Sequence, residues 1–112
     1  FKHENILYGW KPDGAHYFTP DRTQTSVFEV PRPKSSEEHP TMKPVELVEK
    51  MISNSSRPGD IVFDPFLGSG TTMVAAQRLG RICMGIEVDP GYCAVVIDRM
   101  KAMGIEPILL SL

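Results

Sequence analysis

Short apolar runs recur at regular intervals in the second half of the chain. The runs I-V-F at Ile61–Phe63 and I-C-M-G-I-E at Ile82–Glu87 have the length and composition of buried parallel strands. A third run, P-I-L-L-S-L at residues 107–112, has the same character. The pattern therefore predicts three strands, each buried on both faces.

Stretches with helical spacing of apolar residues separate these runs. One predicted helix covers Thr71–Leu79 and ends at Gly80, and another covers residues 92–103 and ends at Gly104. From Asp60 onward the predicted order is strand, helix, strand, helix, strand. This order is typical of α/β proteins and corresponds to part of a doubly wound, Rossmann-like parallel sheet.

The first part of the chain has a different composition. Residues 1–40 contain five prolines and all three histidines, which predicts an irregular arm with short extended pieces at residues 6–8 and 26–30. Such an arm buries little by itself, so we expect it to pack on something else. The remainder, residues 41–112, is predicted to be a β-α-β-α-β half-domain. Within it, the first strand is preceded by a helix with Pro44 in the first turn and apolar residues at Val45, Val48, Met51 and Ile52.

Composition narrows the classes of function. The 112 residues carry 12 basic and 14 acidic side chains, a formal net charge of −2. This balance argues against a free-standing binder of nucleic acid, whose affinity needs clustered lysine and arginine. Cys83 and Cys93 lie among apolar residues and are expected to be free thiols in a reducing compartment, and no ligand cluster predicts a metal site. No membrane-spanning run or signal peptide is visible, so we expect a cytoplasmic protein.

Between the first predicted strand and the helix that follows it lies the loop D-P-F-L-G-S-G-T-T, Asp64–Thr72. A phosphate-binding P-loop would need a lysine after its last glycine, but Thr71 follows Gly70. A dinucleotide-binding loop has a third glycine where this chain has Met73, which weakens that interpretation. The loop therefore favours a nucleotide-type ligand without a pyrophosphate.

S-adenosylmethionine is such a ligand, and its chemistry fits the residues at the strand ends. Its cationic sulfonium and ammonium groups favour a carboxylate, which Asp64 supplies after the first strand. Its ribose hydroxyls need an acceptor, which Glu87 supplies after the second. Two purely structural interpretations stay open. Asp64 could form a turn, and Glu87 or Asp89 could lie in the N-cap region of the next helix.

Three segments together resemble the amino-group DNA methyltransferases, which act on adenine N6 or cytosine N4: H-P-T-M-K-P-V-E-L at residues 39–47, the glycine loop, and G-I-E-V-D-P-G-Y at residues 85–92. The resemblance implies that Thr41 and Lys43 lie near the methionine carboxylate of S-adenosylmethionine and that Asp64 faces its amino group. Glu87 would hold the ribose, with Val88 beside the adenine. The backbone lining the pocket would come from Phe66, Gly68, Gly70, Thr71 and Thr72.

One motif of that family is missing. Its members hold the target amino group with an Asp/Asn/Ser-Pro-Pro-aromatic motif, and this chain contains no Pro-Pro dipeptide. The resemblance therefore implies the carboxyl-terminal, cofactor-binding part of a site-specific DNA methyltransferase, with no catalytic residue of its own and no activity alone. The implied partners are double-stranded DNA, reached through the intact enzyme, and the missing catalytic half. A homodimer through exposed sheet edges is a further expectation.

Two other functions stay open at this point: a dinucleotide-dependent oxidoreductase domain and a non-enzymatic interaction module. In the arm, Trp10 and Tyr17 could stack on a nucleobase or pack in the core, and the sequence favours the core.

Overall fold

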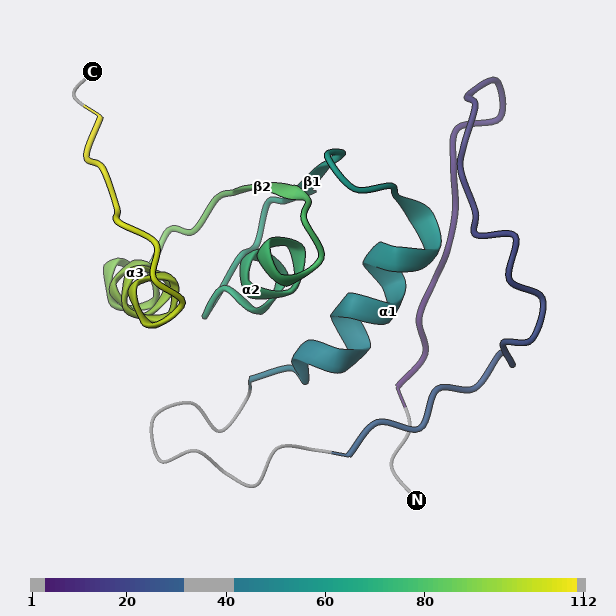
Figure 1. Ribbon diagram of the computed structural model, residues 1–112, viewed down its shortest axis with the longest axis horizontal. Coiled ribbons are helices and arrows are strands. Elements are labelled where there is room, and N and C mark those ends of the chain that lie inside the picture. Colours follow the sequence, from purple (N-terminus) through teal and green to yellow (C-terminus); the bar gives the residue numbers. More distant parts are fainter. Residues whose placement is uncertain (1–3, 32–41, 111–112) are drawn as a thin grey trace.

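The computed structural model describes residues 4–31 and 42–110. Five elements follow one another along the chain (Figure 1). The helices are α1 (Val45–Ser55), α2 (Thr71–Arg78) and α3 (Pro90–Ala102), and the strands are β1 (Ile61–Asp64) and β2 (Ile82–Gly85). The predicted order of elements from Asp60 is therefore confirmed as far as α3. The predicted boundary between residues 40 and 41 lies outside the described residues.

The two strands form a parallel pair, with Ile61 opposite Ile82 and Asp64 opposite Gly85. Helix α2 makes the crossover between them, so β1, α2 and β2 form the βαβ unit of an α/β fold. In this register both strands end at the same edge of the sheet. The loops that follow β1 and β2 are therefore neighbours in space, and they are the loops that carry the candidate ligand-binding residues.

A small core joins the helices to one face of the sheet. Val48 and Ile52 of α1 meet Ala75 and Ala76 of α2, and both alanines are completely buried. Val62 of β1 and Cys83 of β2 pack against this cluster. The alanines allow a close approach of α1 and α2, which lie side by side below the strands, with α3 on the other side of α2 (Figure 1).

The prediction that the strands are buried on both faces is wrong for this chain. Ile61 and Phe63 of β1 are each 61% exposed, and Ile82 and Met84 of β2 are each 54% exposed. These residues alternate with the inward-facing Val62 and Cys83, as the period of two in a strand requires. All three helices lie on one side of the strand pair, so among the described residues nothing covers its second face (Figure 1).

The predicted third strand is also absent from the described part of the chain, where the sheet has two strands. After α3 the chain runs away from the helices without regular structure (Figure 1). Ile108, Leu109 and Leu110 are 80%, 96% and 81% exposed. An apolar run becomes a strand only when a neighbour accepts its backbone hydrogen bonds, and the described residues offer this segment none.

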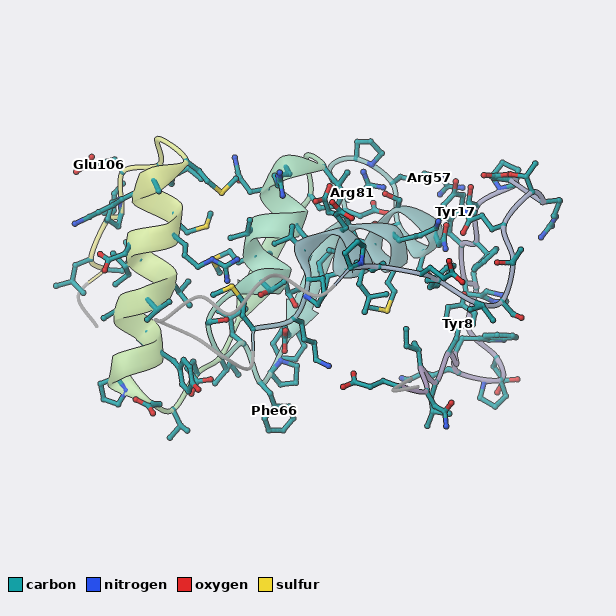
Figure 2. The ribbon with its side chains drawn as sticks, turned by 90° about the horizontal axis from the view of Figure 1, so that it is seen from below. Tyr8, Tyr17, Arg57, Phe66, Arg81 and Glu106 are labelled. Atoms are coloured by element: carbon teal, nitrogen blue, oxygen red, sulfur yellow. The ribbon has the colours of Figure 1, made fainter. Side chains whose placement is uncertain are left out.

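Residues 4–31 of the amino-terminal arm are irregular, and they pack along α1 (Figure 1). The amide of Asn54, which is 6% exposed, exchanges two hydrogen bonds with Gln24, and the Asn54 carbonyl accepts one from the Thr19 amide. Tyr17 lies under the guanidinium of Arg57, 4.1 Å from its ring centre (Figure 2). A single buried asparagine thus anchors the arm to the helix.

Neither ring that the sequence favoured as a core residue belongs to the core cluster. Trp10 is 53% exposed and stacks on His16 within the arm, with 4.0 Å between ring centres. Tyr17 is only half-buried, beneath Arg57. The arm is too irregular to bring these rings to the helix interface, so they pack on polar neighbours instead.

The fold gives a prediction about Gly70, which precedes α2 with φ of +88° and where an added Cβ atom would lie 2.8 Å from Val96 Cγ2. Gly70→Ala should lower the free energy of unfolding by about 2–5 kcal/mol, the sum of a left-handed backbone and an overpacked contact. Gly80→Ala is the matched control, because Gly80 has φ of +74° and open space around its Cβ position. It should cost only about 1–2 kcal/mol.

Urea denaturation of both variants measures the difference. A Val96→Ala background removes the contacts with Cγ2 and Cγ1 and leaves only that with Cβ at 3.3 Å, so the cost of Gly70→Ala should then approach that of Gly80→Ala. If the two glycine substitutions lower the free energy of unfolding equally in the native background, Val96 of α3 does not restrict the space beside residue 70.

Candidate functional site

The candidate site lies at the carboxyl ends of β1 and β2, around the loop of residues 65–70. A turn closes the loop, because the Gly70 amide donates to the Leu67 carbonyl over 3.0 Å. The Leu67 amide donates to the Ile86 carbonyl, at 2.9 Å, and so ties the loop to the segment after β2. The Leu67 side chain covers Gly85, where a Cβ atom would come within 2.7 Å of it. The loop is thus a fixed wall between the two strand ends.

Asp64 is held in place by two hydrogen bonds. Its Oδ1 accepts from the Phe66 amide at 2.9 Å, and its Oδ2 accepts from the Thr72 hydroxyl at 2.7 Å. The first contact is the turn that the sequence allowed as a structural role. The second links the end of β1 to the first turn of α2 and aims the carboxylate along the loop.

Glu87 joins the two loops directly. Its Oε1 accepts from the Gly68 amide and its Oε2 from the Asp89 amide, each at 2.8 Å. The cap of α3 is Asp89, whose side chain accepts from the Gly91 amide at 2.7 Å. Glu87 is therefore not the helix cap. It is the carboxylate that holds the glycine loop against the end of β2.

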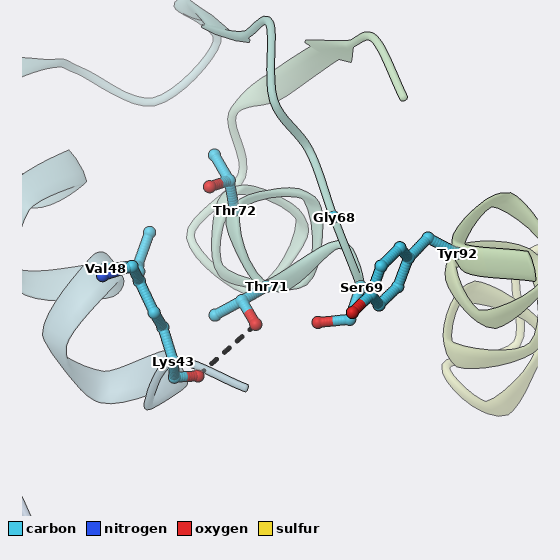
Figure 3. A pocket seen from close by; sticks show the side chains of 7 residues that line it. All are labelled: Lys43, Val48, Gly68, Ser69, Thr71, Thr72 and Tyr92. Atoms are coloured by element: carbon cyan, nitrogen blue, oxygen red, sulfur yellow. Dashed lines mark hydrogen bonds between the residues drawn. The ribbon is translucent and has the colours of Figure 1, made fainter. Parts of the chain in front are cut away.

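Two clefts flank the glycine loop. The first, with a volume of about 240 Å³, lies between α1, the loop and α3 (Figure 3). The second, about 420 Å³, lies between the end of β2 and α3. The first cleft is lined by Lys43, Val48, Gly68, Ser69, Thr71, Thr72 and Tyr92. The second is mostly apolar and is lined by Leu67, Gly85, Ile86, Glu87, Cys93, Val96 and Ile97.

Five of the ten predicted residues line these clefts: Lys43, Gly68, Thr71 and Thr72 the first, and Glu87 the second. Lys43 lines the first, and its ammonium lies 3.5 Å from the Glu4 carboxylate of the arm, both side chains being well exposed. Phe66 and Val88 are 87% and 94% exposed, and the Phe66 ring points away from the helices (Figure 2). Thr41 lies outside the described residues. The ligand contacts assigned to all these residues stay predictions.

Sequence reasoning missed Arg99, which reaches the loop from α3. Its Nη1 donates to the Ser69 carbonyl at 3.0 Å and to the Thr71 hydroxyl at 3.2 Å. Loss of hydration on burial lowers the pKa of this guanidinium. An arginine in the last turn of a helix is ordinarily a solvated C-terminal charge. The sequence signal that could have found it is its position three residues after Val96, on the same face of the helix.

Other chemistries find no support in the described part of the chain. No three histidine, cysteine, aspartate or glutamate side chains there gather into a metal site. Cys83 and Cys93 are both free thiols, and burial, followed by the charge of Asp64, raises the pKa of Cys83. A raised pKa keeps Cys83 protonated and unreactive at neutral pH. No helix among residues 4–31 and 42–110 has the length and apolar character to cross a membrane.

Comparison with known proteins agrees with this geometry. The sequence model of the DNA methylase family that covers N6 and N4 enzymes matches residues 4–98. The Type II methyltransferase M2.DpnII of Streptococcus pneumoniae is 47% identical over 64 residues, which cover 57% of this chain and 24% of the relative. M2.LlaDCHI of Lactococcus lactis subsp. cremoris, also a Type II methyltransferase, is 35% identical over 112 residues, covering 88% of this chain and 42% of the relative.

Among solved structures, the crystal structure of the M1.HpyAVI–SAM complex superposes with a TM-score of 0.67 and 34% sequence identity. The match covers 79% of this chain and 45% of that one. The chain thus spans less than half the length of each of these relatives.

The double role of Glu87 gives a prediction for the site. Glu87→Gln leaves one acceptor oxygen for the two backbone donors, the amides of Gly68 and Asp89. The donor that loses its acceptor then faces the NH2 group of the glutamine. The substitution should lower the free energy of unfolding by about 1–3 kcal/mol, as expected when a hydrogen bond to a charged group is lost. The measurement is urea denaturation, with the exposed Glu106→Gln as a control that should change stability by less than about 0.5 kcal/mol. Equal, small effects would contradict the structural role of Glu87.

Proposed function

The chain belongs to the DNA methylase family, and from this premise we propose that it is the S-adenosylmethionine-binding part of a site-specific DNA methyltransferase. The enzyme would transfer a methyl group to the exocyclic amine of adenine or cytosine in DNA in the cytoplasm. When bound, S-adenosylmethionine supplies the electrophilic methyl group. The residues of this chain bind and orient it, and such positioning is a large part of catalysis in a direct transfer.

The observation that carries this proposal is the pair of preset carboxylates at adjacent strand ends. Asp64 and Glu87 are each fixed by two hydrogen bonds within the protein. Because each carboxylate oxygen has two lone pairs, both groups retain acceptor capacity for a ligand. In the proposal Asp64 takes the ammonium group and Glu87 takes the ribose hydroxyls.

The two clefts suit the two ends of this elongated ligand. In the first, Lys43 supplies a cation for the methionine carboxylate, together with Thr41. The ion pair of Lys43 with Glu4 is exposed and contributes only about 0–1 kcal/mol, so the lysine can exchange it for a ligand carboxylate. The second cleft offers an apolar wall beside Glu87 for the adenine ring, and Val88 follows directly. The ligand would run along the backbone of Phe66, Gly68, Gly70, Thr71 and Thr72.

Family membership disfavours the alternative of a dinucleotide-dependent oxidoreductase. Met73 supports the same choice, because it occupies the position of the third glycine of a dinucleotide loop and lies in the first turn of α2. A non-enzymatic module would need no aligned carboxylates at the strand ends. The proposal of a cofactor-binding part accounts for both carboxylates.

We further propose that the catalytic half of the enzyme covers the open face of the sheet. This face presents Ile61, Phe63, Ile82 and Met84, all more than half exposed. Parallel sheets are normally covered on both faces, and apolar patches of this kind mark interaction sites. The relatives are more than twice as long as the part of them matched here, so they contain enough polypeptide for this layer. Double-stranded DNA would be reached through that half.

A second copy of the chain is the competing occupant of this face. Sedimentation velocity at micromolar concentration distinguishes the two, with Phe63→Lys as the test variant. We expect no dimer through this face, which agrees with a catalytic half as its partner. A dimer that Phe63→Lys dissociates would show that the face pairs two copies and would contradict the proposal.

Cofactor binding is tested by calorimetric titration with S-adenosylhomocysteine. We expect the chain to bind it, and Asp64→Ala to weaken binding at least about tenfold, which corresponds to ~1.4 kcal/mol. Asp60→Ala is the matched control. Asp60 precedes β1 at the opposite end and likewise accepts from a backbone amide, that of Arg57 at 2.8 Å, so its loss should leave the affinity unchanged. Binding of NAD with similar affinity, or no effect of Asp64→Ala on a folded variant, would contradict the proposal.

The missing Pro-Pro motif predicts that the chain alone transfers no methyl group. Incubation of the purified chain with tritiated S-adenosylmethionine and duplex DNA should leave the DNA unlabelled, because nothing in this sequence supplies the motif that holds the target amine. A full-length family member serves as the positive control. Labelled DNA above background would show that residues outside the expected motif can position the base.

A further inference from the structure

Arg99 connects the last turn of α3 to the glycine loop. Its Nη1 donates to the Ser69 carbonyl at 3.0 Å, to the Ser69 hydroxyl at 3.4 Å and to the Thr71 hydroxyl at 3.2 Å. These acceptors lie 28 to 30 residues earlier in the chain. A single side chain therefore ties the end of α3 to the start of α2.

Two neighbours of Arg99 on the same face of α3 also approach the loop. Val96, one turn earlier, closes the space beside Gly70, where a Cβ atom would come within 2.8 Å of it. Tyr92, a further turn earlier, lines the first cleft together with Ser69, and its ring projects from α3 toward that residue (Figure 3). The residues are spaced by three and four positions, so they share one helix face. This face of α3 is the support on which the loop rests.

The contact with Thr71 extends the connection to α1. The Thr71 hydroxyl, which accepts from Arg99, donates to the Lys43 carbonyl at 3.4 Å (Figure 3). Thr71, at the centre of this series of hydrogen bonds from Arg99 to Lys43, is only 6% exposed. It links α3, α2 and the residue before the first turn of α1. Lys43, Ser69 and Thr71 all line the first cleft.

The positive charge of the Arg99 guanidinium strengthens its hydrogen bonds to the loop. Its acceptors are a carbonyl and two hydroxyl oxygens, and no ion pair with a carboxylate involves Arg99 in the described part of the chain. Hydrogen bonds from a charged donor are roughly twice as strong as neutral ones. Because the group is half-buried, these bonds are also less weakened by water than surface contacts.

We propose that Arg99 is a positioning residue for the proposed cofactor site. It fixes Ser69 and Thr71, and through them the conformation of the loop from Gly68 to Gly70, without touching the ligand itself. The inference rests on the proposed function for the ligand, but the positioning of the loop can be measured without any ligand. The positioning of the loop and its effect on ligand binding are therefore tested by separate experiments.

Arg81 provides a matched control. It also makes three hydrogen bonds to loop atoms, donating to the Ser56 hydroxyl, the Ser56 carbonyl and the Leu79 carbonyl at 3.0, 2.7 and 2.8 Å. It precedes β2, so these contacts lie at the opposite end of the sheet from the candidate site. Arg81→Met and Arg99→Met remove the same number of bonds and the same charge, but at different ends of the strands.

The first experiment is amide hydrogen exchange of the free protein. The Gly68 amide donates to Glu87 and the Gly70 amide to Leu67, so both are protected while the loop is ordered. Arg99→Met should accelerate exchange at these two amides about tenfold, equivalent to ~1.4 kcal/mol of local opening. Arg99→Lys, which keeps a charged donor, should restore part of the protection. Arg81→Met should instead accelerate exchange at the Gly59 amide, which donates to Gly80.

The second experiment is calorimetric titration of the same variants with S-adenosylhomocysteine. Arg99→Met should weaken binding about tenfold or more, and Arg99→Lys should weaken it less. Arg81→Met should leave the affinity unchanged, even if it lowers the unfolding temperature as much as Arg99→Met does. Unchanged exchange at Gly68 and Gly70 in Arg99→Met would overturn the inference whether or not the ligand binds. Equal losses of affinity in Arg99→Met and Arg81→Met would also overturn it, since general destabilisation would then suffice. A wild-type chain that does not bind would count against the proposed function alone.

Discussion

The hydrogen bond from the Gly68 amide to the Glu87 carboxylate is the contact on which the site depends. It joins the loop after β1 to the loop after β2 at 2.8 Å, across 19 residues of sequence. The Leu67 amide reinforces it by donating to the Ile86 carbonyl. A parallel βαβ unit brings two strand ends together but does not fix the loops beyond them. Glu87 supplies that constraint, and so the same carboxylate builds the site and faces its proposed ligand.

Much of this arrangement was predictable because it rests on local signals. Apolar spacing indicated the helices and their order, and Gly80 and Gly104, both with positive φ, follow α2 and α3 as helix-ending glycines should. The placement of Asp64 and Glu87 followed from one topological rule, that the carboxyl ends of parallel strands share an edge. No side-chain contact was needed for either prediction. That is why one sequence was sufficient for both.

The features that the sequence did not predict correctly all depend on contacts between residues that are distant in sequence. The run containing Ile108 to Leu110 has the composition of a strand, but a strand also requires a neighbour. Phe63 and Met84 are as apolar as buried residues, yet composition does not say which face the helices cover. Arg99 has the charge of a solvated residue, and its contact with Ser69 distinguishes it. Burial is decided by contacts between distant residues, and the spacing of apolar residues along the chain does not indicate those contacts.

The open sheet face and the preset loop together argue for a division of labour within the enzyme. The face with Phe63 needs another layer of polypeptide, whereas the loop around Gly68 is held by hydrogen bonds without one. In the proposed function, a cofactor-binding part organised in this way would form its ligand contacts before the proposed catalytic half is in place. The ordering entropy of the loop is then lost on folding rather than on binding, which favours ligand affinity. The supports of the loop, Glu87 after β2 and Arg99 from α3, are both internal to this chain, so its geometry does not depend on the partner.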